Sequence, residues 1–439
     1  MEYFMYIHFK TFGCKVNLYE TENMKQNFSE KGFSVTDNEY ESDIFVINTC
    51  TVTETGDKKV FKELRRLRRE YPDSVIAVTG CYPQAFPNEA ADITEADIVV
   101  GTKNRNALPD IINEYLESRK RTVDICNYTS NDVFEDMCNA GYENNTRAFI
   151  KIQDGCNMFC TYCIIPYSRG RFRSKPINKL KEEAEKLAAS GYQEIVLVGI
   201  NLSFYGIEYK LRLADAVETI CAINGIKRVR LGSLEPEMIN DEDIRRLAAQ
   251  PKFCPQFHLS LQSGCDKTLI EMNRRYTTAD YAELVQKLRD NFDNCAITTD
   301  VMVGFPNETE EDFKQSVEFV KKINFAKVHV FPYSQRKGTP AADFENQIPT
   351  SQKNIRAKIM SEAAEESRQK FLQSQSGLTF PVLFEREKAD KIPHGYTPNY
   401  TLVKIFTKNL GKSLRNQIFY VKIERIENDY CVGEIVSEQ

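Results

Sequence analysis

The chain has 439 residues, of which 41% are hydrophobic and 28% are charged, as expected for a globular protein with two or three domains. Its formal net charge of -5 gives no overall attraction to nucleic acid, so any RNA contact has to come from a local patch. Its apolar runs are shorter than a membrane span, and its first residues lack the basic and apolar regions of a secretory signal. We therefore expect a cytoplasmic protein without a membrane segment.

The 13 cysteines are too sparse in a chain of this length for a disulfide scaffold, so they indicate metal ligation or buried thiols. Six of them occupy positions suited to metal ligands. The other seven show no ligand spacing and are interpreted as buried or incidental thiols: Cys126, Cys138, Cys221, Cys254, Cys265, Cys295 and Cys431.

Apolar segments alternate with helical patterns through residues 1–118, which predicts an α/β domain with an open parallel sheet covered by helices. The expected strands are residues 6–11, 43–48, 75–79 and 97–101. The expected helices are residues 18–31, 58–70 and 107–119.

A cysteine follows each of the first three strands, at Cys14, Cys50 and Cys81. Because the carboxyl ends of parallel strands lie at one edge of a sheet, where ligands usually bind, we expect the three thiols to meet there. They would form a metal site with one open position. The alternative is that each cysteine is a small buried residue at the end of a strand.

Residues 119–144 are polar and rich in turn formers, and we interpret them as a linker. Beyond it, Cys156, Cys160 and Cys163 follow the spacing C-x3-C-x2-C. Structural zinc sites and ordinary electron-transfer clusters use four ligands, whereas three cysteines leave one iron open. This spacing, with the aromatic Tyr162 before the last cysteine, resembles the radical S-adenosylmethionine (SAM) superfamily. The alternative is a zinc site with a distant fourth ligand.

Between residues 145 and 375 the chain repeats a strand-then-helix pattern six times, which predicts a partial (β/α)6 barrel. The expected strands are residues 149–153, 194–200, 228–231, 256–261, 297–303 and 327–331. The expected helices are residues 180–190, 211–223, 239–249, 280–291, 310–323 and 350–373.

Chemistry in such barrels takes place at the carboxyl ends of the strands. The residues at these ends are therefore candidates to bind SAM, although each of them could also be a plain turn residue. Together with Tyr162, the candidates are Gly199, Asn201, Ser233, Glu235, Gln262 and Val303.

Positive charge is concentrated in residues 58–69 and in residues 168–175, which hold four cations around one aromatic residue. Such groups bind phosphate backbones or stacked bases, and the alternative is a solvated surface. The candidate RNA contacts are Lys62, Arg65, Arg169, Arg171, Arg173 and Arg274.

Residues 376–439 contain short β-rich runs at 379–384, 400–405, 417–423 and 430–435. These runs predict a small antiparallel β-barrel, a shape that often holds RNA. Its charges nearly cancel, so electrostatics alone would not indicate an RNA partner.

Over essentially its full length the chain resembles the methylthiotransferases, with an N-terminal methylthiotransferase domain (1–118), a radical SAM domain (145–375) and a TRAM domain (376–439). The resemblance implies that Cys156, Cys160 and Cys163 hold the radical SAM [4Fe-4S] cluster and that Cys14, Cys50 and Cys81 hold an auxiliary one. It also implies two SAM molecules per turnover. One methylates sulfur at the auxiliary cluster, and the other yields the radical that activates a substrate C–H bond.

The segments 11–20, 48–53, 79–82 and 151–156, which include four of these cysteines, look most like the family branch that acts on threonylcarbamoyladenosine. This implies a tRNA anticodon stem-loop as substrate, methylthiolated at C2 of N6-threonylcarbamoyladenosine 3′ of the anticodon. We also expect an electron donor of the flavodoxin or ferredoxin type and a monomeric enzyme. The alternatives are isopentenyladenosine in tRNA, an aspartate of a ribosomal protein, or an iron-sulfur RNA-binding protein without activity.

Overall fold

The computed structural model of the protein describes residues 5–138, 141, 145–387, 392–406 and 413–438. The chain divides into two compact units. Unit 1 comprises Met1–Asn139, Gln153–Lys175 and Ser334–Asp343, and unit 2 comprises Ala140–Ile152, Pro176–Tyr333 and Phe344–Gln439. Both groups of three cysteines therefore belong to unit 1, although the predicted domain boundaries separate them. Residues 139–140 and 142–144 of the predicted linker lie outside the described residues.

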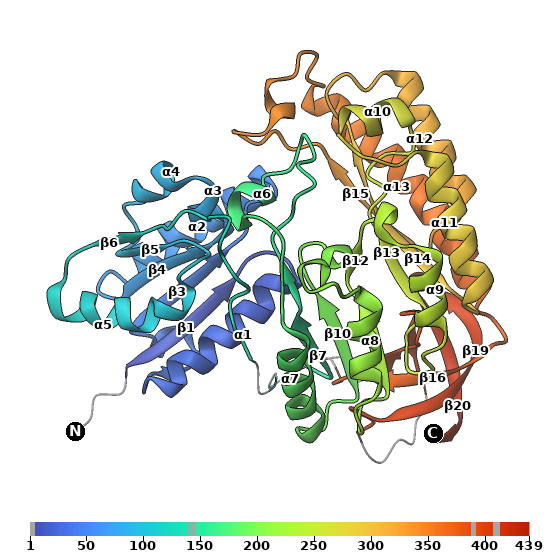
Figure 1. The fold of residues 1–439 in the computed structure, drawn as a ribbon, viewed down its shortest axis with the longest axis horizontal. Coiled ribbons are helices and arrows are strands. Elements are labelled where there is room, and N and C mark those ends of the chain that lie inside the picture. The colour runs from blue at the N-terminus through green and yellow to red at the C-terminus, as the bar shows by residue number, and fades with distance from the viewer. Residues whose placement is uncertain (1–4, 139–140, 142–144, 388–391, 407–412, 439) are drawn as a thin grey trace. The chain divides into compact units, whose positions relative to one another are not determined.

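Unit 1 is built on a six-stranded sheet in which all neighbouring strands are parallel, in the order β2-β1-β3-β4-β5-β6 (Figure 1). The strands are β1 (Tyr6–Thr11), β2 (Ser34–Val35), β3 (Ile44–Thr49), β4 (Val75–Gly80), β5 (Ile98–Val100) and β6 (Thr122–Asp124). The helices are α1 (Lys15–Glu30), α2 (Glu54–Glu70), α3 (Cys81–Ala85), α4 (Pro87–Ala91) and α5 (Leu108–Ser118), with 3-10 turns η1 (Glu39–Glu41) and η2 (Arg105–Ala107). The predicted parallel α/β domain is confirmed. Strands β2 and β6, of two and three residues, are too short to give a sequence pattern.

The sheet of unit 1 has an apolar core on each face, which explains the uninterrupted apolar run of β3. Ile44 and Val46 pack into one core together with residues of α1 and α5. Phe45 and Ile47 point to the opposite face and pack with residues of α2. Strands that are covered on both faces of a parallel sheet are typically near-continuous apolar runs.

The strand order reverses at β1, which pairs with β2 on one side and with β3 on the other. In doubly wound sheets, the connections on the two sides of such a reversal run in opposite directions and leave a crevice at the carboxyl ends of the strands. Cys14 follows β1 and Cys50 follows β3, so both flank the position where ligands bind in this fold class.

The larger part of unit 2 is a partial barrel of parallel strands that follow one another in chain order (Figure 1). One sheet, in the order β11-β10-β7, contains β7 (Arg147–Lys151), β10 (Glu194–Val198) and β11 (Arg228–Leu231). The other contains β12 (Ser233–Leu234), β13 (Gln256–Leu259), β14 (Ala296–Val303) and β15 (Lys327–Pro332). Because only Gly232 separates β11 from β12, the two sheets continue the same barrel wall. The predicted partial barrel is confirmed.

The helices of this barrel agree with the predicted segments, except for the short α10, which the sequence pattern did not indicate. They are α7 (Ile177–Ala189), α8 (Leu213–Cys221), α9 (Asp241–Ala248), α10 (Asp266–Glu271), α11 (Thr278–Asn291), α12 (Glu310–Ile323) and α13 (Thr350–Gln373), with 3-10 turns η3 (Leu202–Phe204), η4 (Ile207–Tyr209) and η5 (Pro236–Met238). No helix in the described ranges is both long and apolar enough to cross a lipid bilayer.

Unit 2 ends in a closed barrel with the strand order β16-β17-β18-β20-β19. Its strands are β16 (Thr379–Phe384), β17 (His394–Tyr396), β18 (Leu402–Lys404), β19 (Ile418–Glu427) and β20 (Tyr430–Glu438). The predicted small barrel is confirmed, with two differences. The strand β17 is not among the predicted runs, and β18 pairs with β20 in parallel, whereas the other neighbours are antiparallel.

Buried charges and two tyrosines join the small barrel to the partial barrel within unit 2. The rings of Tyr396 and Tyr400 stack with centroids 4.5 Å apart, and the Arg147 guanidinium lies 5.0 and 4.9 Å from their centroids. Arg230 lies 4.6 Å from the Tyr400 centroid, and its Nε donates to Glu194 Oε1 at 2.8 Å. The two rings are thus engaged by guanidinium groups inside the protein, which argues against their use for stacking on RNA bases.

Replacing Glu194 by alanine is expected to destabilise unit 2, because this fully buried carboxylate pairs with Arg228 and Arg230. Removing one partner of a buried ion pair typically costs about 3–5 kcal/mol. Denaturant unfolding followed by circular dichroism measures the loss. The exposed Glu362 of α13 gives the matched control, and Glu362→Ala should change the unfolding free energy by less than about 0.5 kcal/mol. Equal effects of the two substitutions would contradict the role of Glu194.

Candidate functional site

Unit 1 brings Cys14, Cys50 and Cys81 to the carboxyl ends of three neighbouring strands. Cys14 is the N-cap of α1, Cys50 follows β3, and Cys81 is the first residue of α3. Two glycines with φ of +125° and +104°, Gly13 and Gly80, make this approach possible. A Cβ on Gly13 would lie 2.8 Å from the Cys50 Cβ, and one on Gly80 would lie 2.4 Å from the Thr49 carbonyl oxygen. Side chains at these positions would push the strand ends apart.

Burial and mutual proximity disfavour the thiolate forms of Cys50 and Cys81 when no metal is bound. Burial, and after it the neighbouring Cys81, raises the pKa of the Cys50 thiol to about 12. Burial also raises the pKa of Cys81. Thiolates are the metal-binding form of cysteine, and three of them so close together repel one another. The positive charge of bound iron offsets this repulsion, so the donor set suits an iron-sulfur cluster.

Cys156, Cys160 and Cys163 lie in a loop that a short antiparallel pair closes, formed by β8 (Gln153–Asp154) and β9 (Arg173–Ser174). The Cys163 N–H donates to the Cys160 carbonyl at 3.0 Å, and the Cys156 N–H donates to the Gly170 carbonyl at 3.1 Å. The Met158 N–H points at the Cys156 sulfur at 3.5 Å, an interaction that stabilises a thiolate. The loop therefore also fits a cluster that needs three thiolate ligands.

The backbone of this loop is folded tightly against its own return segment. Gly155 has φ of +72°, and a Cβ at this position would lie 2.0 Å from the Arg171 carbonyl oxygen. The short helix α6 (Ile165–Arg169) follows the cysteines and leads into this return segment. Only glycine fits at position 155.

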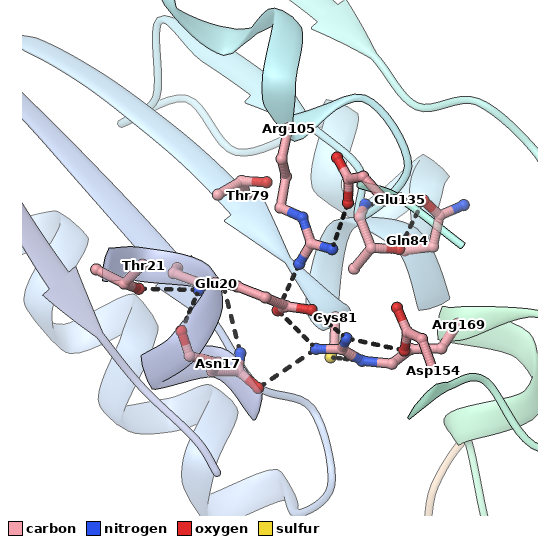
Figure 2. A network of polar contacts seen from close by, with 12 residues as sticks. Asn17, Glu20, Thr21, Thr79, Cys81, Gln84, Arg105, Glu135, Asp154 and Arg169 are labelled. Carbon is pink, nitrogen blue, oxygen red and sulfur yellow. Dashed lines mark hydrogen bonds and ion pairs between the residues drawn. The ribbon is translucent and has the colours of Figure 1, made fainter. Parts of the chain in front are cut away.

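A network of buried charges extends from α1 and the turn η2 to the cysteine loop (Figure 2). Arg169 binds both oxygens of Glu20, at 2.6 and 3.0 Å, and its Nη1 donates to Asp154 Oδ1 at 3.2 Å. Arg105 pairs with the same Glu20 carboxylate at 2.5 Å and with Glu135 at 3.1 Å. The side chains of Glu20, Arg105 and Arg169 are 0% exposed. The two guanidinium groups share the Glu20 carboxylate, and the carboxylates of Glu135 and Asp154 supply the further negative charge that allows their burial.

A second connection in unit 1 involves the segment Ser334–Asp343, which contains the short helix η6 (Pro340–Asp343). The Arg336 guanidinium donates to Thr51 Oγ1 at 2.5 Å, directly after Cys50, and to Asp57 Oδ2 at 2.7 Å. The Ala341 N–H donates to the Thr161 carbonyl at 2.8 Å, between Cys160 and Cys163. This segment, which is remote in sequence, therefore contacts residues adjacent to both cysteine groups.

The predicted SAM contacts of unit 2 lie at or directly after the carboxyl ends of its barrel strands. Asn201 is buried and accepts a hydrogen bond from the Ser203 N–H at 3.2 Å. Gln262 has φ of +65° and forms backbone hydrogen bonds with Asp300 and Met302, each at 2.8 Å. The remaining candidates are Gly199 after β10, the exposed Ser233 of β12, Glu235 after β12 and the buried Val303 of β14, whereas Tyr162 belongs to unit 1.

Three of the six predicted RNA contacts, Arg169, Arg173 and Arg274, are buried in the interior of the protein. They are therefore not available as surface cations for an RNA phosphate. Arg169 takes part in the buried network. Arg173 donates to two backbone carbonyls and lies 4.7 Å from the Tyr128 centroid. Arg274 is buried and donates to Glu235 Oε1 at 3.3 Å, so this SAM candidate is also engaged in an ion pair. The exposed cations of the set are Lys62, Arg65 and Arg171.

Sequence reasoning missed a polar cluster on neighbouring strands of unit 2. The ligand-type atoms of His258, Asp300 and His329 lie within 4.8 Å of one another, a spacing that a metal ion can bridge. His258 Nε2 lies 3.3 Å from Asp300 Oδ2, and His258 Nδ1 lies 3.0 Å from Thr298 Oγ1, so ordinary hydrogen bonds account for the same geometry. The three residues are far apart in sequence, and only the parallel strand pairing brings them together.

Comparison with known proteins places this chain in a family. The model of the radical SAM superfamily matches residues 150–320, and that of the uncharacterized protein family UPF0004 matches residues 6–101. The threonylcarbamoyladenosine tRNA methylthiotransferase MtaB of Bacillus subtilis (strain 168) is 38% identical over 438 residues, which cover 98% of this chain and 96% of the relative. This chain belongs to the radical SAM methylthiotransferase family. It is thus a radical SAM enzyme, and its radical SAM domain implies SAM and a [4Fe-4S] cluster as cofactors.

This methylthiotransferase is also similar to a tRNA-modifying relative with a different name and to a protein of solved structure. The tRNA-2-methylthio-N(6)-dimethylallyladenosine synthase of Clostridium tetani (strain Massachusetts / E88) is 36% identical over 439 residues, covering 97% of this chain and 95% of the relative. The radical SAM methyltransferase TsrM of Kitasatospora setae, solved with cobalamin and a [4Fe-4S] cluster, matches with a TM-score of 0.58 and 13% identity. This match covers 77% of this chain and 74% of TsrM, and it supports the fold alone.

Gly155→Ala is expected to reduce iron binding by the Cys156 loop of this methylthiotransferase. The variant is made in a protein whose Cys14, Cys50 and Cys81 are alanine, and iron and sulfide are measured after anaerobic reconstitution. Gly191→Ala is the matched control, because Gly191 has φ of +88° but no atom within 4 Å of a new Cβ. Both variants introduce the left-handed strain of about 1–2 kcal/mol, and only Gly155→Ala adds the collision. Equal iron contents would contradict the expected packing requirement.

Proposed function

We propose that this methylthiotransferase inserts a methylthio group at C2 of N6-threonylcarbamoyladenosine, 3′ of the anticodon in tRNA. The B. subtilis relative is named for this substrate, and the similarity extends over 98% of the chain. The segments that resemble this branch include Cys14, Cys50, Cys81 and Cys156, and all four cysteines belong to unit 1. An aromatic C–H bond of this kind has no acidic proton for a base to remove, which is why the reaction needs radical chemistry.

Six of the eight cysteines of unit 1 are the proposed ligands of two [4Fe-4S] clusters. Cys156, Cys160 and Cys163 hold the radical SAM cluster, and Cys14, Cys50 and Cys81 hold the auxiliary one. When bound, the clusters supply reductive cleavage of SAM and a site for the sulfur that is transferred. The protein supplies strand ends without obstructing side chains, backbone donors to sulfur, and the ion network that connects the two cysteine groups.

The remaining assignments belong to the same proposal. Two SAM molecules are used per turnover. The proposed SAM contacts are Tyr162 in unit 1 and the residues at the strand ends of the partial barrel in unit 2. A donor of the flavodoxin or ferredoxin type reduces the enzyme, which acts as a monomer in the cytoplasm. The exposed Lys62, Arg65 and Arg171 are the proposed contacts to the phosphates of the anticodon stem-loop.

The second candidate substrate is an adenosine with a dimethylallyl (isopentenyl) group in tRNA. The C. tetani relative, which is 36% identical, is named for the dimethylallyladenosine product and thus favours this alternative over the remaining ones. In both cases the methylthio group would be added to a modified adenosine in tRNA. The sequence identities to the two relatives, 38% and 36%, are nearly equal, so the substrate has to be decided by experiment.

Mass spectrometry of nucleosides from cells with and without the gene tests the substrate. We expect the deletion to remove 2-methylthio-N6-threonylcarbamoyladenosine and to accumulate its unthiolated precursor. The wild-type gene should restore the nucleoside, and a gene carrying Cys160→Ala should not. Loss of the 2-methylthio form of dimethylallyladenosine instead would transfer the assignment to the second candidate.

Single cysteine variants separate the roles of the two proposed clusters in the reduced, anaerobic enzyme. Cys160→Ala should abolish the release of 5′-deoxyadenosine from SAM, because it removes a ligand of the radical SAM cluster. Cys50→Ala should retain this release and lose the methylthio product. Cys126 also lies in unit 1 but is not a proposed ligand, so Cys126→Ala should retain both activities. Full methylthio product from Cys50→Ala would overturn the auxiliary site.

A further inference from the structure

Arg169 forms hydrogen bonds to Cys81 and to the segment that leads into the Cys156 loop, so it contacts both cysteine-bearing regions of unit 1. It is the last residue of α6, and its side chain is 0% exposed. Its Nε donates to the Cys81 sulfur at 3.3 Å, and its Nη1 donates to Asp154 Oδ1 at 3.2 Å, two residues before Cys156 (Figure 2). One guanidinium group therefore connects a proposed auxiliary ligand with the radical SAM loop.

The position of Arg169 is fixed from the other side by Glu20. The carboxylate of Glu20 lies between two guanidinium groups: it accepts two hydrogen bonds from Arg169 and pairs with Arg105 at 2.5 Å. Planar, forked contacts of this kind define the orientation of a guanidinium as well as its place. Nε of Arg169 is thereby directed at the Cys81 sulfur.

Asn17 extends the same contacts to the other two strand ends. Its Oδ1 accepts from Arg169 Nη2 at 3.4 Å and lies 3.4 Å from the Cys14 sulfur, which donates to it. Its Nδ2 donates to the Thr49 carbonyl at 2.9 Å, next to Cys50. Through Asn17 and its own bond to Cys81, Arg169 is linked to each of the three strand ends that carry the cysteines.

A buried cation that donates to a ligand sulfur affects the reduction of the cluster. Reduction adds negative charge to the cluster, and a nearby guanidinium stabilises the reduced form more than the oxidised form. Hydrogen bonds to the sulfurs and local charge are among the factors that set the potential of iron-sulfur clusters. We propose that Arg169 is a positioning residue that holds the Cys81 sulfur as a ligand and raises the reduction potential of the auxiliary cluster. This inference rests on the proposed function, in which Cys14, Cys50 and Cys81 bind that cluster.

The test uses the full chain with Cys156, Cys160 and Cys163 replaced by alanine, so that only the auxiliary site can be loaded. After anaerobic reconstitution, iron and sulfide are measured, and the midpoint potential is determined by a redox titration followed by electron paramagnetic resonance. Arg169→Gln removes the charge, and Arg169→Lys keeps the charge without the forked geometry. If Arg169→Gln fails to fold, the double variant Glu20→Gln/Arg169→Gln removes the buried pair as a whole and takes its place.

Glu135→Gln is the matched control, because it alters the same network at Arg105. We expect Arg169→Gln to lower the midpoint potential by at least about 59 mV, which corresponds to a tenfold change in the equilibrium constant of a one-electron reduction. Arg169→Lys should lower it less, and Glu135→Gln, which removes a negative charge, should not lower it.

The possible outcomes distinguish this inference from the proposed function. An unchanged potential in the iron-loaded Arg169 variants overturns the role of Arg169 and leaves the auxiliary cluster intact. An equal shift in Glu135→Gln also overturns it, because the effect would then belong to the network in general. Failure of the parent protein to bind iron overturns the auxiliary cluster itself, and the inference with it.

Discussion

The arrangement of unit 1 depends on the burial of the Glu20 carboxylate between Arg105 and Arg169. A buried carboxylate is tolerated only when cations and hydrogen bonds replace its water, and its two guanidinium partners meet this requirement. The three side chains come from α1, from the turn before α5 and from α6. Ion pairing in the interior thus joins α1 and the turn before α5 to the loop that carries Cys156. The cysteine groups lie in one compact unit although the chain places them far apart.

Glycines provide the space that this arrangement requires. At Gly13 and Gly80, atoms of a neighbouring strand end occupy the space that a Cβ would need. At Gly155, atoms of the return segment of the cysteine loop occupy that space. Because their φ angles are positive, other residues would add backbone strain to the steric collision. The site is therefore shaped by positions without side chains as much as by the thiols themselves.

Arginine has different roles in the two units, and local sequence does not distinguish them. In residues 168–175, Arg169 and Arg173 turn inward and pair with carboxylates or backbone carbonyls, whereas Arg171 stays exposed. In unit 2, Arg147 and Arg230 pack against Tyr400 and attach the small barrel to the larger one. A run of cations can therefore indicate internal ion pairs as well as an RNA surface.

The sequence by itself determined the secondary structure of the long elements, the parallel character of the unit 1 sheet and of the partial barrel, and the short three-cysteine motif from Cys156 to Cys163. These features depend on local periodicity and short spacings, such as the apolar run of β3 and the motif from Cys156 to Cys163. Only the tertiary structure decided the composition of the two units, the inward direction of Arg169, and the meeting of His258 with Asp300 and His329. Pairing between buried charges, and between strands far apart in the chain, depends on long-range contacts that leave no periodic pattern in the sequence.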